Sequence, residues 1–85
     1  MEANEAQVIK AIAHEMRIEM AKKDWKQQEL ADKIGITRET ASRYLTGKKQ
    51  MPIDVFLRAA AEFGISPAEL MYRAVDRAAQ AGSQD

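Results

Sequence analysis

The sequence contains no cysteine, one histidine, four glycines and two prolines. The absence of cysteine excludes a disulfide framework, a thiolate zinc site and a cysteine nucleophile. One histidine cannot build a histidine-rich metal site, and so few glycines and prolines do not fit a loop-rich or β-rich fold. The apolar runs are only a few residues long, far short of the roughly 18–20 that cross a membrane.

A chain of 85 residues makes one small domain. Such a domain has little room for an enzyme pocket, and no nucleophile–base set, metal cluster or cofactor motif is recognisable. We therefore expect a binding module that uses no metal and no cofactor. The N-terminal stretch Met1-Glu2-Ala3-Asn4-Glu5 is acidic and does not read as a signal peptide. The expectation is an intracellular, soluble protein with no membrane partner.

The charges balance overall, with 13 basic and 13 acidic residues, but they are unevenly distributed. Residues 22–49 hold eight basic and four acidic side chains, whereas the segments before and after are each net acidic. A basic middle is compatible with a face that binds a polyanion, and also with ordinary surface scatter. Charge alone does not decide between these interpretations.

Apolar residues recur at spacings of three and four, which is typical of amphipathic helices, and no segment alternates as a strand would. Together with helix-ending glycines, this spacing predicts helices at about 4–23, 27–34, 38–46, 52–63 and 67–79. Ser66-Pro67-Ala68-Glu69 forms a capping box ahead of the last helix. Trp25 is expected to plug the core between helices, and residues 80–85 to fray. The predicted fold is all-α, one domain over residues 4–79.

The most informative stretch covers residues 27–46, a short helix, a glycine turn and a second helix. Ala31 is small, which lets the two helices cross closely, and Gly35 supplies the left-handed turn residue. Ile34 and Ile36 fill the angle between the helices, and Thr37 caps the second one. This arrangement predicts a helix-turn-helix, whose second helix can enter the major groove of DNA.

These residues resemble the Cro/phage-repressor (XRE) helix-turn-helix family. The family pattern T-Q-x-x-L-A-x-x-hydrophobic-G-hydrophobic-S/T, closed later by G-K, matches KQQELADKIGIT at residues 26–37 and Gly47-Lys48. The likeness extends through Phe56-Leu57-Arg58 and on to Leu70, about residues 8–72 in all. Lys26 and Leu45 depart from it, because the family often has a capping Thr or Ser and a polar residue there. The resemblance implies a lambda-repressor-like domain of about five helices.

The resemblance also implies roles for the matched positions. Base edges would be contacted by Arg38, Glu39, Ser42 and Arg43 of the recognition helix. Phosphates would be contacted by Gln27, Thr37, Thr40, Lys48 and Lys49. The other interpretation of the recognition-helix residues is a solvated face, with Glu39 and Arg43 as a surface ion pair.

Family members commonly dimerise over half-sites about one turn of DNA apart. Candidates for the dimer surface are Met71, Val75 and Ala78 on the last helix and Ile18 on the first. The alternative is that the last helix only packs on its own domain. The implied function is that of a bacterial or phage-encoded, cytoplasmic repressor that binds a duplex operator as a homodimer and is nucleoid-associated when bound. Two alternatives stay open: an antitoxin that also masks a partner protein, and a protein-interaction adaptor.

Overall fold

The computed structural model describes residues 4–82 and consists of five helices joined by short turns, with no strand in that range. The helices are α1 (Glu5–Lys23), α2 (Gln27–Ile34), α3 (Arg38–Leu45), α4 (Ile53–Phe63) and α5 (Pro67–Gly82). The prediction of an all-α fold is therefore confirmed. Asn4 and Gly35 lie where the sequence places helix ends, as the N-cap of α1 and the C-cap of α2.

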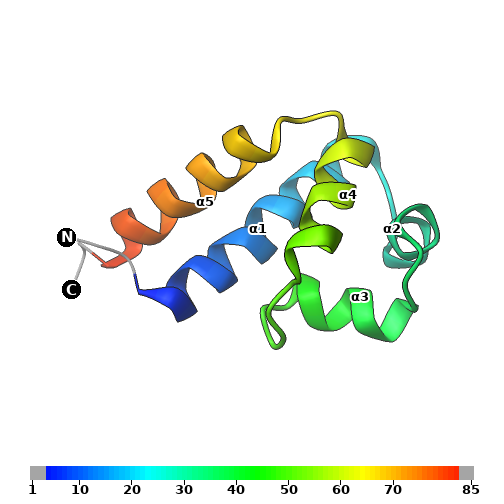
Figure 1. The fold of residues 1–85 in the computed structure, drawn as a ribbon, viewed down its shortest axis with the longest axis horizontal. Helices are drawn as coiled ribbons and strands as arrows, with labels where there is room; N and C mark the ends of the chain where they lie inside the picture. Colours follow the sequence, from blue (N-terminus) through cyan, green and yellow to red (C-terminus); the bar gives the residue numbers. More distant parts are fainter. Residues whose placement is uncertain (1–3, 83–85) are drawn as a thin grey trace.

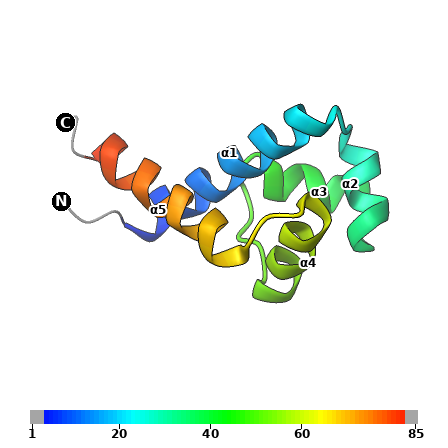
Figure 2. The same cartoon turned by 90° about the horizontal axis from the view of Figure 1, so that it is seen from above.

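The long helix α1 runs through the middle of the molecule (Figure 1). Helix α5 returns antiparallel along α1, from near Glu19 back toward its N-terminus, and α2, α3 and α4 gather toward the other end of α1, as the turned view in Figure 2 also shows. The main core forms among all five helices, with Met16, Leu30, Leu45 and Leu70 fully buried. Trp25 plugs this core from the side as predicted, with its ring stacked on Phe63 at a centroid distance of 5.4 Å.

A second, smaller cluster joins α5 to α1, and it corrects one prediction. Ala78 is only 2% exposed because it packs with Ala74 against Ala11 of α1, so it belongs to the core and offers no surface to a partner. The last helix is described to Gly82, three residues beyond the expected end at 79. Residues 83–85 of the expected tail and residues 1–3 of the N-terminal stretch lie outside the described part of the chain.

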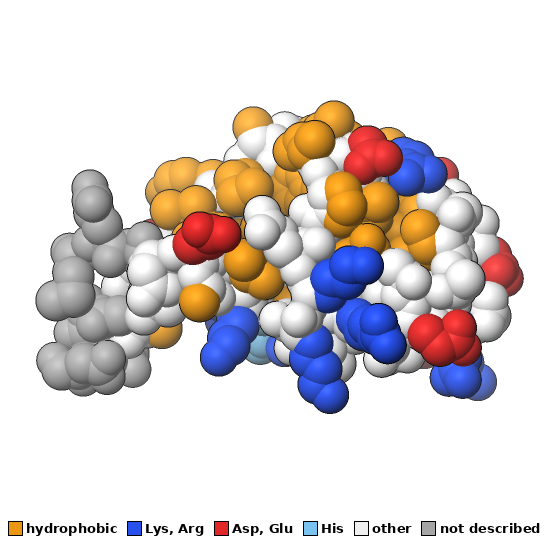
Figure 3. Space-filling model, turned by 60° about the horizontal axis from the view of Figure 1, so that its bottom comes forward, with side chains coloured by type: hydrophobic (Ala, Val, Ile, Leu, Met, Phe, Trp, Pro, Cys, Tyr) orange, Lys and Arg blue, Asp and Glu red, His pale blue; other side chains and the backbone are white. Residues whose placement is uncertain are grey.

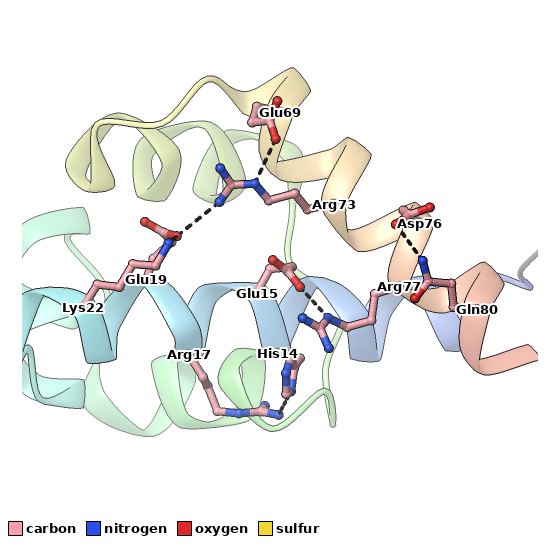
Figure 4. A network of polar contacts seen from close by, with 10 residues as sticks. All are labelled: His14, Glu15, Arg17, Glu19, Lys22, Glu69, Arg73, Asp76, Arg77 and Gln80. Atoms are coloured by element: carbon pink, nitrogen blue, oxygen red, sulfur yellow. Dashed lines mark hydrogen bonds and ion pairs between the residues drawn. The ribbon is translucent and has the colours of Figure 1, made fainter.

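Two buried carboxylates, Glu15 and Glu19, were not anticipated on the buried side of α1. Arginines of α5 reach across to them, Arg77 to Glu15 and Arg73 to Glu19, as Figure 4 shows. Arg73 also donates to Glu69 at 2.8 Å, and this hydrogen bond raises the pKa of its guanidinium above the ordinary value. Both carboxylates are therefore paired, which is the condition for burying charge without a large penalty.

Candidate nucleic-acid interface

The turn between α2 and α3 has the geometry that the sequence predicts for a helix-turn-helix. Gly35 has a φ of 75°, in the left-handed region where a side chain would be strained. The Ile36 N–H donates to the Ala31 carbonyl at 3.0 Å and closes the end of α2. Thr37 then caps α3, because its hydroxyl accepts from the Thr40 N–H at 3.1 Å. Backbone geometry and one cap thus fix the angle at which α3 leaves the domain.

Two arginines outside the motif hold its helices by their C-terminal ends. Arg58 of α4 donates from Nη1 to the Ile34 carbonyl at 2.9 Å, and Arg17 of α1 donates to the Leu45 carbonyl. Cations at these positions satisfy free carbonyls and complement the negative ends of the helix dipoles. Sequence reasoning missed both roles, since a bond to a backbone carbonyl 24 or 28 residues away leaves no local pattern.

The outer face of α3 brings together the four residues predicted to contact bases. They surround a shallow hollow of about 360 Å³, lined by Arg38, Glu39, Ser42, Arg43, Thr46 and Lys48. In the described part of the chain, neither Glu39 nor Arg43 forms an ion pair, so the surface pair weighed in the sequence analysis is not made. The hollow therefore presents two guanidinium groups, a carboxylate and a hydroxyl to an external ligand.

Of the residues predicted to contact phosphates, only Lys48 lines this hollow, and the others lie in different surroundings. Gln27 is the first residue of α2 and half-buried. Lys26 provides no side-chain cap there, and its own N–H donates to Glu29 at 3.1 Å. The first N–H groups of α2 thus find no acceptor within residues 4–82, which suits a phosphate oxygen.

The two threonines are coupled to each other. The hydroxyl of Thr37, besides capping α3, contacts that of Thr40 at 2.8 Å. If Thr37 donates in this contact, the proton of Thr40 stays free for a phosphate, and Thr37 acts mainly as a cap.

The two lysines after α3 diverge. Both backbone N–H groups donate to the Arg43 carbonyl, at 3.1 and 3.3 Å, and close the end of the helix. The Lys48 side chain lines the hollow, whereas the Lys49 ammonium lies 5.9 Å from the centre of the Tyr44 ring. Figure 3 shows Lys and Arg side chains as a blue band across the face that contains α3 and this loop.

The residues predicted for a dimer surface do not lie together. Met71 and Val75 lie one turn apart on α5. Met71 is half-buried, and Val75 is 44% exposed. Ile18 is half-buried on α1. It lies six residues after Ile12, so the two side chains leave the helix about 120° apart around its axis. Met71 and Ile12 line one groove, so Ile18 points to a different side of α1.

Within residues 4–82, no group of three or more His, Asp or Glu side chains could hold a metal ion. None of the five helices is both long enough and apolar enough to span a membrane.

The chain was compared with known proteins. A protein-family model described as Helix-turn-helix matches residues 8–70. The structure of the clp gene regulator ClgR from Corynebacterium glutamicum is similar, with 21% identity over 91% of this chain and 82% of that one, at a TM-score of 0.84. The structure of a hypothetical transcription factor NHTF from Neisseria is also similar, with 24% identity over 84% of this chain and 80% of that one, at a TM-score of 0.72. Curated protein sequences gave no significant match. Since the family model covers most of its length, this chain belongs to the XRE family of helix-turn-helix proteins.

Proposed function

We propose that the protein binds duplex DNA sequence-specifically, with α3 in the major groove, and acts as a transcriptional repressor. The state of the arginines carries this proposal. Arg17, Arg58, Arg73 and Arg77 each donate to an acceptor within the molecule. Arg38 and Arg43 do not, as far as the described residues show, and both lie on α3. A guanidinium group left without a partner on an exposed recognition helix is well suited to a guanine edge.

The surroundings of α3 supply the sequence-independent part of binding. Lys48 lines the hollow together with Arg38 and Arg43, and the N-terminus of α2 at Gln27 has no side-chain cap. Phosphates on the two sides of a major groove would be held by these groups, together with Thr40 and Lys49. Glu39 would accept a hydrogen bond from a cytosine amino group. Phosphate contacts set the register, and contacts with base edges select the sequence.

Repression would follow from binding of the protein to its operator. One helix-turn-helix reads only a few base pairs, so we propose that two copies bind an operator of two half-sites, with Met71 and Val75 on the dimer surface. A dimer that covers promoter DNA excludes polymerase from it. Cytoplasmic localisation and association with the nucleoid belong to this proposal.

The salt dependence of duplex binding tests the proposal against the adaptor alternative. Phosphate contacts release counterions, so log K should fall with log salt by about 0.9 per neutralised phosphate. We expect the Arg38→Ala/Arg43→Ala double variant to lose the difference in affinity between selected and random duplexes. Lys22→Ala is the matched control, because Lys22 pairs with Glu19 on the α5 side of α1. Absence of duplex binding, or binding that is insensitive to salt, would favour an adaptor, and a co-purifying small protein would favour an antitoxin.

A further inference from the structure

A second cluster of hydrogen-bond donors lies outside the helix-turn-helix, on α1. A shallow hollow of about 310 Å³ opens there between α1 and α5. Its polar lining consists of Gln7, Lys10, His14, Arg17 and Arg77, and the remaining lining residues are alanines. No carboxylate lines the hollow, so it offers an ammonium, an imidazole, two guanidinium groups and an amide. The function proposed above uses none of these groups to contact DNA.

The cluster is fixed to the end of the recognition helix. Arg17 donates to the carbonyl of Leu45, the last residue of α3, and its Nη2 lies 3.3 Å from Nδ1 of His14. Lys10 lies against the loop that follows, since a Cβ atom at Gly47 would be 3.4 Å from its Cα atom. Figure 4 shows His14 and Arg17 together below the α1 ribbon, and Figure 3 shows blue and pale-blue side chains side by side at the left of the basic band. The donors of α1 therefore continue the basic face around α3.

The donors of this cluster differ in whether the molecule already uses them. The guanidinium of Arg17 is held at the end of α3, and that of Arg77 is held by Glu15. Lys10 forms no ion pair within residues 4–82, and the positions three and four away from it on α1 hold alanine, glutamine and histidine, so its own helix offers no carboxylate. A guanidinium only donates, so Nδ1 of His14 accepts from Arg17, and the neutral ring carries its proton on Nε2. An ammonium and an imidazole N–H are thus left for an external acceptor.

We propose that Lys10 and His14 contact phosphates of the duplex beyond the bases that α3 reads, on the side of the loop that follows α3. A phosphodiester has a negative charge and oxygen acceptors but no donor, so a cluster of donors without a carboxylate complements it. Phosphates follow one another along each strand, so a basic face that is continued along α1 meets further phosphates of the same duplex. The inference deepens the proposed function and rests on it, since it adds a sequence-independent contact outside the helix-turn-helix.

The length of the duplex tests the inference. A minimal duplex that carries one half-site is extended by about one helical turn of arbitrary sequence, at one end or at the other. We expect extension at one end only to tighten wild-type binding by at least about threefold at low salt, and to steepen the salt dependence by about 0.9 per added phosphate contact. A wild-type protein that gains nothing from either extension, or gains equally from both, would overturn the inference.

Substitutions on α1 assign the gain to the two side chains. Lys10→Gln removes the charge but keeps most of the stem that lies beside Gly47, and His14→Ala removes the ring. The double variant should bind the minimal duplex like the wild type and lose the gain from extension, whereas Lys10→Arg should keep it. Lys22→Gln is the matched control, because Lys22 lies on the same helix but pairs with Glu19. Circular dichroism should show every variant folded. A double variant that keeps the full gain, or that loses affinity equally for all three duplexes, would overturn the inference.

Photo-cross-linking locates the contact on the duplex. The chain has no cysteine, so Lys10→Cys protein carries a photoreactive thiol reagent at a single position. Under light it should link to the extension that raises the affinity and not to the other extension, and labelled Lys22→Cys protein should link to neither. Labelled Lys10→Cys protein that links to both extensions alike, or to no duplex, would contradict the inference.

Failure of this inference is distinct from failure of the proposed function. If a half-site is bound with a preference that depends on Arg38 and Arg43 but extension adds nothing, recognition by α3 stands and the contact from α1 is rejected. If all sequences bind alike and the gain from extension still depends on Lys10, the contact from α1 stands and sequence-specific reading is rejected. Absence of binding to every duplex would overturn both.

Discussion

At the scale of single residues, the proposed function rests on which side chains the fold leaves without a partner among the described residues. Arg58 and Arg17 are held at the ends of α2 and α3 by backbone carbonyls, and their positive charge is used inside the molecule. Arg38 and Arg43 are equally charged but extend from the outer face of α3 into the hollow. The same residue type is thus structural in one place and available for a ligand in the other.

The first prediction concerns readout by Arg43. Arg43→Ala should cost about 1–3 kcal/mol on the cognate duplex and relax the preference at one base position, because a bidentate contact with guanine is lost. Competition binding on a set of single-base variants of the site measures both effects. Equal weakening on cognate and random duplexes would show that Arg43 touches phosphate only.

The second prediction concerns the two lysines after α3. Lys48→Ala and Lys49→Ala should each weaken binding to all sequences alike and lower the salt slope by about one contact. Both side chains are exposed, so the midpoint of urea denaturation should stay unchanged. A change in the selected sequence in Lys48→Ala would require a different placement of α3 on the duplex.

At the scale of elements, the ends of the helices decide how α3 is presented. Gly47 and Gly64 both follow helix ends and have almost the same φ, 75° and 73°. They differ in their surroundings. A Cβ atom at Gly47 would lie 3.3 Å from Cγ and 3.4 Å from Cα of Lys10, whereas nothing lies within 4 Å of one at Gly64. The loop after α3 is therefore held against α1, and the turn after α4 is not.

The third prediction uses this difference. Gly64→Ala should lower the free energy of unfolding by about 1–2 kcal/mol, the cost of a left-handed conformation with a side chain. Gly47→Ala should cost more than that, because the crowding against Lys10 is added to the same backbone term. Urea denaturation of the two variants measures the difference. Duplex affinity at native conditions should fall only in Gly47→Ala, and the reverse order of effects would contradict the account.

Much of this element-scale description could be predicted from the sequence, because caps and turn glycines are local signals. Asn4, Gly35 and Thr37 lie at helix ends as expected. The long-range features could not be predicted. Glu15 and Glu19 are paired with arginines more than fifty residues away, and Ala78 is buried against α1. The sequence of each residue's own helix therefore does not indicate that it is buried. The groove was missed for a related reason, since a helix pattern shows which side is apolar but not how much of it is covered.

At the scale of the whole molecule, one domain presents two separate surfaces. One is the basic face around α3, which is proposed to bind DNA, and the other is an apolar groove between α1, α4 and α5. Helix α5 packs on α1 and α4. Its inner side is fixed to α1 by Ala74, Ala78 and the two arginine–glutamate pairs, and its outer side carries Val75.

The fourth prediction concerns this outer side. Because Val75 is 44% exposed, Val75→Asp should leave the protein folded. It should nevertheless weaken dimerisation and, through it, binding to a two-half-site operator, while binding to a single half-site is retained. Circular dichroism and sedimentation on the one variant separate these effects. A variant that is folded, fully dimeric and normal on the operator would remove Val75 from the dimer surface.

The central claim is that α3 reads the sequence of duplex DNA, and selection from a random pool of duplexes tests it most directly. The account predicts that repeated selection enriches one sequence, made of two inverted half-sites about one helical turn apart. It also predicts that the Arg38→Ala/Arg43→Ala protein selects nothing in common, although it still retains duplex at low salt. A wild-type pool without a shared sequence, or with no duplex retained at all, would contradict the claim.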